Sequence, residues 1–203
     1  MSFIKPSRLE LAMHEAGHAY AFAALIPWEQ PLELGLAVDT MGNDHGWCNR
    51  REILHREVRL ASVPIDALPS FEWQAAAEVV IAVAGTLAEF RHRLRGRVKA
   101  AFTILDNAPS FLKKDAYDTD GDFARIRGTL QYIEAPDPLV TFRNLIGVCD
   151  EITHRNWSSI RALGRLLFER GRMAEQDLID WFEAHPAVPN RVPLTIRRSA
   201  PQH

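Results

Sequence analysis

The sequence predicts a mainly α-helical protein with one small β-hairpin. Apolar residues recur at helical spacing along several segments, which are bounded by capping residues, glycines and prolines. One short region alternates in polarity as a strand does. With 203 residues, of which 47% are hydrophobic and 25% charged, the chain is long enough to form one domain with a substantial core. We place this domain at residues 1–185 and expect a flexible tail, rich in proline and arginine, at 186–203.

The first helix is predicted from Arg8 to Ile26. Ser7 and Glu10 have the spacing of a capping box, in which each side chain accepts a hydrogen bond from the other residue's backbone N–H. The apolar run that follows ends at Pro27, because proline cannot continue the helical hydrogen-bond ladder.

A small β-hairpin is predicted after this helix. Residues 32–38 alternate weakly in polarity, and residues 39–44 are rich in turn-forming aspartate, glycine and asparagine. Residues 45–48 can then form the partner strand.

The rest of the chain is predicted to be helical apart from one loop. A long helix follows Ser70 and runs from Phe71 to about Leu94, where nearby arginines and Gly96 suit a helix C-terminus. Residues 97–117 carry no clear helical pattern, and we expect a mobile loop there. Further helices are predicted after the acidic cluster at 115–122 to about Tyr132, from Pro138 to Arg155, from Trp157 to Arg170 with Gly171 as its end, and from Ala174 to Glu183.

Composition gives no indication of a nucleic-acid or membrane surface. The formal net charge is -2, and Cys48 and Cys149 belong to no metal or redox motif, so we expect reduced thiols. The first residues lack the apolar core of a signal peptide, and the longest apolar stretch, Val79–Leu87, is too short to span a bilayer. We therefore expect a cytoplasmic protein with no nucleic-acid partner and no membrane partner.

The most informative motif is His-Glu-x-x-His within the first helix. His14 and His18 are four residues apart, so both imidazoles lie on one face of a helix and can bind the same metal ion. Glu15 lies beside that face, where it can accept a proton from an attacking water. Two neutral nitrogen ligands with an adjacent base are typical of a zinc hydrolase.

A catalytic zinc ion needs a third protein ligand from elsewhere in the chain. A metzincin would have glycine at position 21 and histidine at position 24, where this chain has Ala21 and Ala24, so that class is excluded. A thermolysin-like arrangement would use a glutamate from a later helix, and Glu89 and Glu78 are the candidates.

Several segments resemble FtsH-type zinc peptidases, the protease half of membrane-bound AAA+ proteases. Residues 12–19 are similar to the family's metal-binding helix, and Gly46 resembles a glycine of its short strand region. Residues 84–89 are similar to its Gly-x-x-Ala-Glu helix, and 119–125 to the segment that carries its third ligand. The similarities keep the same order over most of residues 9–183.

The resemblance implies a zincin-like helical domain in which His14, His18 and Asp122 bind zinc and Glu15 is the general base. A carboxylate at the first turn of a helix, such as Asp122, is also oriented by free backbone N–H groups. The implied activity is that of a metalloendopeptidase. A strand edge near the metal helix can receive an extended peptide through main-chain hydrogen bonds.

Several roles stay open within this acidic and histidine-containing set. Asp118 and Asp120 are alternative third ligands, and Asp120 or Asp122 could instead only cap a helix. Glu89 is expected behind a ligand imidazole, where it would orient the ring. His45, His55 and Tyr117 are candidates for a second oxyanion donor.

The chain also departs from FtsH-type proteases. It contains no Gly-x-x-x-x-Gly-Lys-[Ser/Thr] loop, so we expect a stand-alone peptidase domain without an ATPase module. Its substrates should then be flexible or unfolded polypeptides, or proteins brought by a delivery partner, and the chain could form a homo-oligomer.

Two other interpretations compete with a peptidase. In the first, the chain is a non-catalytic zinc-binding regulator or adaptor, whose zinc would be enclosed by a fourth ligand such as His45, Asp118 or Asp120. In the second, it is a helical interaction protein with incidental histidines. Gly17 argues against the second, because a glycine inside a helix indicates close approach of another backbone.

Overall fold

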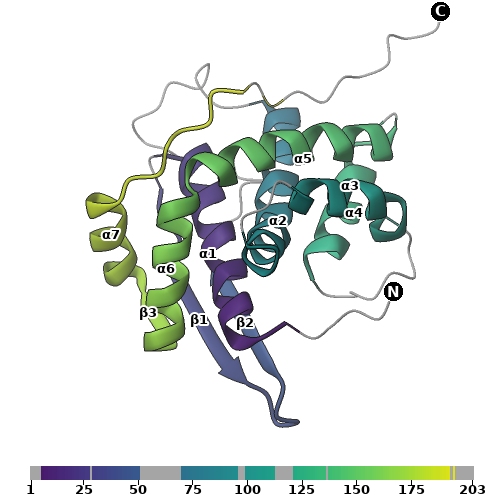
Figure 1. The fold of residues 1–203 in the computed structure, drawn as a ribbon. Coiled ribbons are helices and arrows are strands. Elements are labelled where there is room, and N and C mark those ends of the chain that lie inside the picture. The colour runs from purple at the N-terminus through teal and green to yellow at the C-terminus, as the bar shows by residue number, and fades with distance from the viewer. Residues whose placement is uncertain are drawn as a thin grey trace, which may run out of the picture.

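The computed structural model describes residues 6–27, 29–50, 70–95, 99–112, 121–135, 137–192 and 194. Within these residues the chain forms a helical body with a three-stranded antiparallel sheet along one side (Figure 1). The elements in chain order are α1 (Arg8–Leu25), β1 (Glu33–Val38), β2 (Asp44–Asn49), α2 (Phe71–Arg93), α3 (Lys99–Phe111), α4 (Asp122–Tyr132), α5 (Pro138–Arg155), α6 (Trp157–Arg170), β3 (Arg172–Ala174) and α7 (Glu175–Ala184).

This architecture confirms a mainly α-helical fold with a small β-hairpin. The capping box of α1 is formed as predicted: Glu10 N donates to Ser7 Oγ at 3.3 Å, and Ser7 N donates to Glu10 Oε2 at 2.6 Å. The side chains of Ser70 and Asp137 cap α2 and α5. Gly171 ends α6 in the left-handed region, with φ of 77°, where a glycine carries no steric penalty.

Helices α1 and α2 form the central pair of the body and run antiparallel. Glu10 of α1 contacts Arg93 of α2, whereas His18, two turns further along α1, contacts Ile81, three turns earlier in α2. The backbones approach closely at Gly17, where an added Cβ would lie 2.5 Å from the carbonyl oxygen of Ala84. The close approach expected from a glycine inside this helix is confirmed.

Two buried apolar clusters include residues of this pair. The larger one joins α1 and α2 to α3, α4 and α5, and the smaller one joins α1 and Ala88 of α2 to β1, β3, α6 and α7. Helix α2 is long and apolar enough to cross a membrane by length and composition, although its apolar stretch Val79–Leu87 alone is not. Within the fold, however, 78% of its most apolar window is buried by the rest of the protein.

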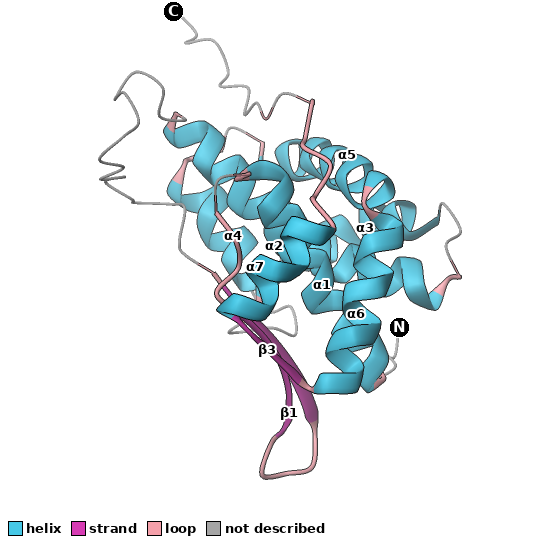
Figure 2. Ribbon diagram, turned by 90° about the vertical axis from the view of Figure 1, so that its left-hand side faces the viewer, coloured by secondary structure: helices cyan, strands magenta, loops and turns pink. Residues whose placement is uncertain are grey.

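The sheet has the strand order β2-β1-β3 and lies at one end of the helical body (Figure 2). Strands β1 and β2 form the predicted hairpin, with Leu34 opposite Cys48. The third strand was not predicted. It covers three residues, too few for a periodic pattern, and forms because Gly171 directs the chain alongside β1, where Met173 pairs with Leu34.

The prediction of a loop at residues 97–117 is wrong for much of that region. Residues Lys99–Phe111 form α3, in which Ala100, Ile104 and Ala108 follow one another at four-residue spacing and are buried against the larger cluster. The helix contains Pro109, and the preceding residue in the sequence, Val98, is not a typical capping residue, so its local signals are weak and burial of its apolar face stabilises it. Residues 113–117 lie outside the described part of the chain.

The described part of the predicted tail contacts the helical body. Asn190 N donates to the carbonyl oxygen of Ala24 at 3.0 Å, and Val188 N donates to Asn156 Oδ1 at 2.7 Å. Leu194 is buried. Residues 195–203 lie outside the described residues.

Candidate metal centre

The predicted motif lies on the face of α1 that packs against α2. His18 and Glu15 are buried, with 7% and 5% of their surface exposed, and His14 is partly buried beside them. The helical spacing of four places the two imidazoles in edge-to-face contact, with their ring centroids 4.6 Å apart. The two rings therefore point into one common space.

The Nδ1 nitrogen of each imidazole already has a partner within the protein. His18 Nδ1 donates to the backbone carbonyl of Ile81 at 2.7 Å, because a carbonyl oxygen can only accept. His14 Nδ1 lies 3.3 Å from Glu89 Oε2. A proton held on Nδ1 leaves the lone pair of Nε2 free, which is the form of histidine that binds a metal.

Asp122 completes the cluster from a distant part of the chain. Its Oδ2 lies 3.0 Å from His14 Nε2 and 3.0 Å from His18 Nε2, although Asp122 and His14 are 108 positions apart. Asp122 opens α4, as expected, but the N-cap is Gly121 and no side chain caps this helix. The interpretation of Asp122 as a helix cap is therefore not supported, and its carboxylate points toward the histidines instead.

These three donor atoms fit a metal such as zinc. The imidazole nitrogens and the carboxylate oxygen all lie within 4.8 Å of one another. Ligands about 2.0–2.1 Å from a tetrahedral zinc ion are separated by roughly 3.3 Å, close to the two nitrogen–oxygen distances of this cluster. Two nitrogens and one carboxylate oxygen are also a donor set that zinc accepts in catalytic sites.

Gly85 of α2 provides the space that the imidazoles occupy. A Cβ at this position would lie 2.4 Å from His18 Nε2 and 2.6 Å from His14 Nε2. Any side chain here would therefore collide with both metal-binding nitrogens. Gly85 lies in the segment 84–89 that resembles the FtsH-type family, but its role could not be predicted, because a contact between two helices leaves no local signal in the sequence.

Glu15 lies next to the cluster but does not belong to it. Its carboxylate points toward strand β2, where an added Cβ on Gly46 would lie 2.5 Å from Glu15 Oε1. Burial raises the pKa of Glu15, His14 and His18 lower it, and the net result is a pKa above its ordinary value. A carboxylate with a raised pKa next to a metal site is suited to proton transfer.

The charges of the cluster stabilise one another. Burial lowers the pKa of His14, but Asp122 and Glu89 outweigh it and hold this pKa well above its usual value, so a metal ion that bound Nε2 would displace a proton from this ring. Burial raises the pKa of Asp122, yet the two imidazoles lower it strongly, so the carboxylate stays ionised. An ionised oxygen is therefore available as a ligand.

The other candidates from sequence analysis lie in different places. Glu78 forms a two-point ion pair with Arg50, at 3.0 and 2.6 Å, and does not face the cluster. Glu89 contacts the far nitrogen of His14, as expected for an orienting partner. His45 is exposed on β2, with its ring 6.0 Å from that of Trp47. Asp118, Asp120, His55 and Tyr117 lie outside the described residues.

Both cysteines are free. Burial raises the pKa of the Cys48 thiol well above its usual value, and the neighbouring Glu15 and Asp122 carboxylates add to this effect. Cys48 lies near the site but does not belong to the cluster of His14, His18 and Asp122.

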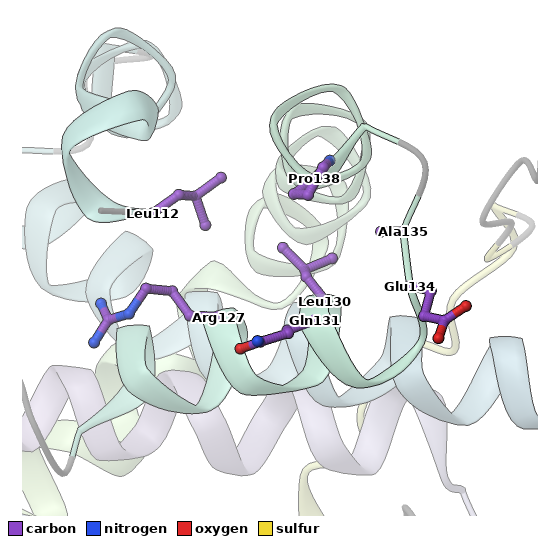
Figure 3. Close-up of a pocket in the computed structure, with 7 residues that line it drawn as sticks. All are labelled: Leu112, Arg127, Leu130, Gln131, Glu134, Ala135 and Pro138. Carbon is purple, nitrogen blue, oxygen red and sulfur yellow. The ribbon is translucent and has the colours of Figure 1, made fainter. Parts of the chain in front are cut away.

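A separate pocket of about 390 Å³ lies along α4 (Figure 3). Arg127, Leu130 and Gln131 line it from α4, and Glu134 lines it from the turn that follows α4, at the opposite end from Arg127. The remaining lining residues are Leu112, Ala135 and Pro138. None of these residues belongs to the cluster of His14, His18 and Asp122.

No family model matches the chain, and no curated protein sequence matches it. Membership of the FtsH-type peptidases thus stays a prediction from motifs. Any functional assignment therefore depends on the arrangement of the side chains themselves.

Proposed function

We propose that the protein is a zinc-dependent metalloendopeptidase that hydrolyses peptide bonds in flexible or unfolded polypeptides. One observation carries this proposal: His14 Nε2, His18 Nε2 and Asp122 Oδ2 converge, while the buried Glu15 carboxylate lies beside them without joining them. Three protein ligands with an adjacent free carboxylate are typical of a catalytic zinc site.

Each residue of the site would have a distinct role. His14, His18 and Asp122 would hold the zinc ion, which when bound acidifies water and polarises a carbonyl group. Glu15 would accept a proton from the attacking water and pass it to the nitrogen of the leaving amine. The raised pKa of Glu15 suits both transfers, because the same carboxylate must take up the proton and release it.

The sheet supports a peptide as the substrate. Among the described strands, β2 lies at the edge of the sheet and pairs only with β1, and its Gly46 lies against Glu15. An extended peptide that paired with the outer edge of β2 would run past the Glu15 carboxylate. Main-chain pairing of this kind suits flexible chains, since a flexible segment can adopt the extended conformation that pairing requires.

A non-catalytic zinc-binding regulator or adaptor remains the alternative. A structural zinc site is normally enclosed by four protein ligands. In the part of the chain that the structure describes, the cluster has three, and His45 lies elsewhere. Burial of Glu15 without a ligand role also favours a catalytic site, because burying a carboxylate is costly unless it serves a purpose.

The proposal is tested first by elemental analysis of the purified, untagged chain, with one zinc ion per chain expected. Cleavage of casein and of a peptide library should then depend on zinc and stop when a chelator is added. A zinc-containing protein that cleaves no substrate would favour the regulator, and a chain without stoichiometric metal would contradict both.

Glu15→Gln tests the role of the base. We expect this variant to keep its zinc and to lose about 10²–10⁴-fold in turnover, because the amide cannot accept the proton. Glu169→Gln, on the exposed face of α6, is the matched control and should cleave as the wild type does. Wild-type turnover in Glu15→Gln would remove Glu15 from the mechanism.

A further inference from the structure

A row of charged side chains extends from the candidate metal centre to the start of α1. On α1, Glu10 lies one turn before His14, and on α2, Arg93 lies one turn after Glu89. Because the two helices are antiparallel, these turns face each other. Arg93 Nη2 donates to Glu89 Oε1 at 2.7 Å, and Arg93 Nε donates to Glu10 Oε1 at 2.8 Å.

Glu89 has both carboxylate oxygens engaged. Oε1 accepts from Arg93, and Oε2 faces His14 Nδ1 at 3.3 Å. Only 12% of its side chain is exposed, so water contributes little to holding the carboxylate in place. Without Arg93, Oε1 would lose its charged donor, and the carboxylate could turn away from the imidazole.

Arg93 is itself held from the other side. Glu10 accepts from Arg93 through Oε1 and from Ser7 N through Oε2, at 2.6 Å, as part of the capping box. The guanidinium therefore lies between two carboxylates, of which Glu10 is also held by the backbone N–H of Ser7. A planar group with several N–H donors suits this bridging position better than a single ammonium group does.

We propose that Arg93 is a positioning residue of the metal centre, which acts through Glu89 to orient His14 for metal binding. This inference rests on the proposed function, since it assumes that His14 is a ligand. His18 offers the internal contrast, because its Nδ1 donates to the backbone carbonyl of Ile81 and needs no such support. Outer partners of a ligating histidine typically change metal affinity by about 10–100-fold.

A double-mutant cycle on the full chain tests the inference. The zinc dissociation constant is measured by chelator competition for wild type, Arg93→Met, Glu89→Gln and the double variant. We expect Arg93→Met to weaken zinc binding by roughly 10–100-fold and to add little to Glu89→Gln, because both changes remove the same support. Additive effects would overturn the inference, since Arg93 would then not act through Glu89.

Arg155→Met is the matched control. Arg155 also pairs with a glutamate four residues earlier on a long helix, Glu151 of α5, away from the cluster. We expect this variant to bind zinc as the wild type does. Equal weakening by Arg155→Met and Arg93→Met would overturn the inference, because the effect would then be general to such pairs.

The remaining outcomes are also decisive. Wild-type zinc affinity in folded Arg93→Met would refute the role of Arg93 while leaving the zinc site intact, whereas a wild-type chain without zinc affinity would refute the proposed function itself. If Arg93→Met does not fold, the same cycle is run with Arg93→Gln, which removes the charge but keeps a polar side chain. Folded Arg93→Gln with wild-type affinity, or with an effect additive to Glu89→Gln, would then refute the inference.

Discussion

The two histidines of α1 are supported in different ways. His18 lies in the interior, and its far nitrogen donates to the backbone carbonyl of Ile81 in the middle of α2. His14 lies nearer the start of α1 with twice the exposure, 18% against 9% of the side chain, and its far nitrogen faces the carboxylate of Glu89. One candidate ligand is thus oriented by the folded backbone, and the other by charged side chains.

This difference separates two ways in which the site could fail. A backbone carbonyl stays in place when its own side chain is changed, so the hydrogen bond that orients His18 is lost only if α1 and α2 move apart. The contact that orients His14 can be lost when a single side chain is substituted, while the fold persists. Four further substitutions test this contrast, and they are ordered by the size of the expected effect.

The largest effect is expected from Gly85→Ala, which disturbs both sides at once. The new methyl group would lie 2.4 Å from His18 Nε2 and 2.6 Å from His14 Nε2, so α1 and α2 must separate. We expect the loss of stoichiometric zinc and a fall of about 1–3 kcal/mol in the free energy of unfolding, as for other overpacked interiors. Elemental analysis and urea unfolding measure the two effects.

Gly147→Ala is the control for that experiment. Gly147 lies inside α5, and an added Cβ there would meet nothing within 4 Å. Alanine should stabilise this helix by roughly 0.5–1 kcal/mol and leave zinc content unchanged. Full zinc occupancy in Gly85→Ala would show that the cluster does not bind metal as the geometry suggests.

Asp122→Ala should affect both histidines equally, because Asp122 Oδ2 is 3.0 Å from each Nε2. As the loss of a proposed ligand, it should weaken zinc binding by more than the roughly 100-fold that an outer partner contributes. Asp137→Ala removes a true N-cap at the start of α5 and should cost about 0.5–2 kcal/mol of stability with zinc retained. If the two variants bind zinc alike, the third ligand lies elsewhere.

Gly46→Ala should distinguish the role of the base, Glu15, from that of the metal ligands. The added methyl group would lie 2.5 Å from Glu15 Oε1 and displace that carboxylate, while the ligand atoms are untouched. We expect turnover to fall by about 10²-fold, the typical cost of a displacement near 1 Å, with zinc content unchanged. Steady-state peptide cleavage and elemental analysis on the same sample check both parts.

The smallest effect is expected from Glu10→Gln, and it concerns the stability of the fold at acid pH. Burial raises the pKa of Glu10, but hydrogen bonds from Arg93 and Ser7 outweigh it and lower this pKa below its ordinary value of 4.5. The carboxylate therefore stabilises the fold above pH 4.5, and this contribution is lost as the pH falls through the lowered pKa. Urea unfolding on either side of that pH should show a shallower pH dependence for Glu10→Gln than for wild type.

Local signals in the sequence were reliable where the structure depends on neighbouring residues. The capping box at Ser7 and Glu10, the four-residue spacing of His14 and His18, and the glycine that ends α6 were all predicted correctly. Helix α3 and strand β3 were not, because α3 contains Pro109 and follows no typical capping residue, and β3 is too short for a periodic pattern. Both form where apolar surface or an unpaired strand edge of another element is available.

By itself, the sequence determined the face of α1 that carries two imidazoles and a carboxylate, because helical geometry fixes the relation of residues one to four positions apart. It could not choose by spacing among Glu78, Glu89 and Asp122 as their partner, since separation along a chain carries no information about distance in space. Only the packing of α2 and α4 against α1 decided this. It pairs Glu78 with Arg50, sets Glu89 behind His14, and brings the first residue of α4 between the two rings.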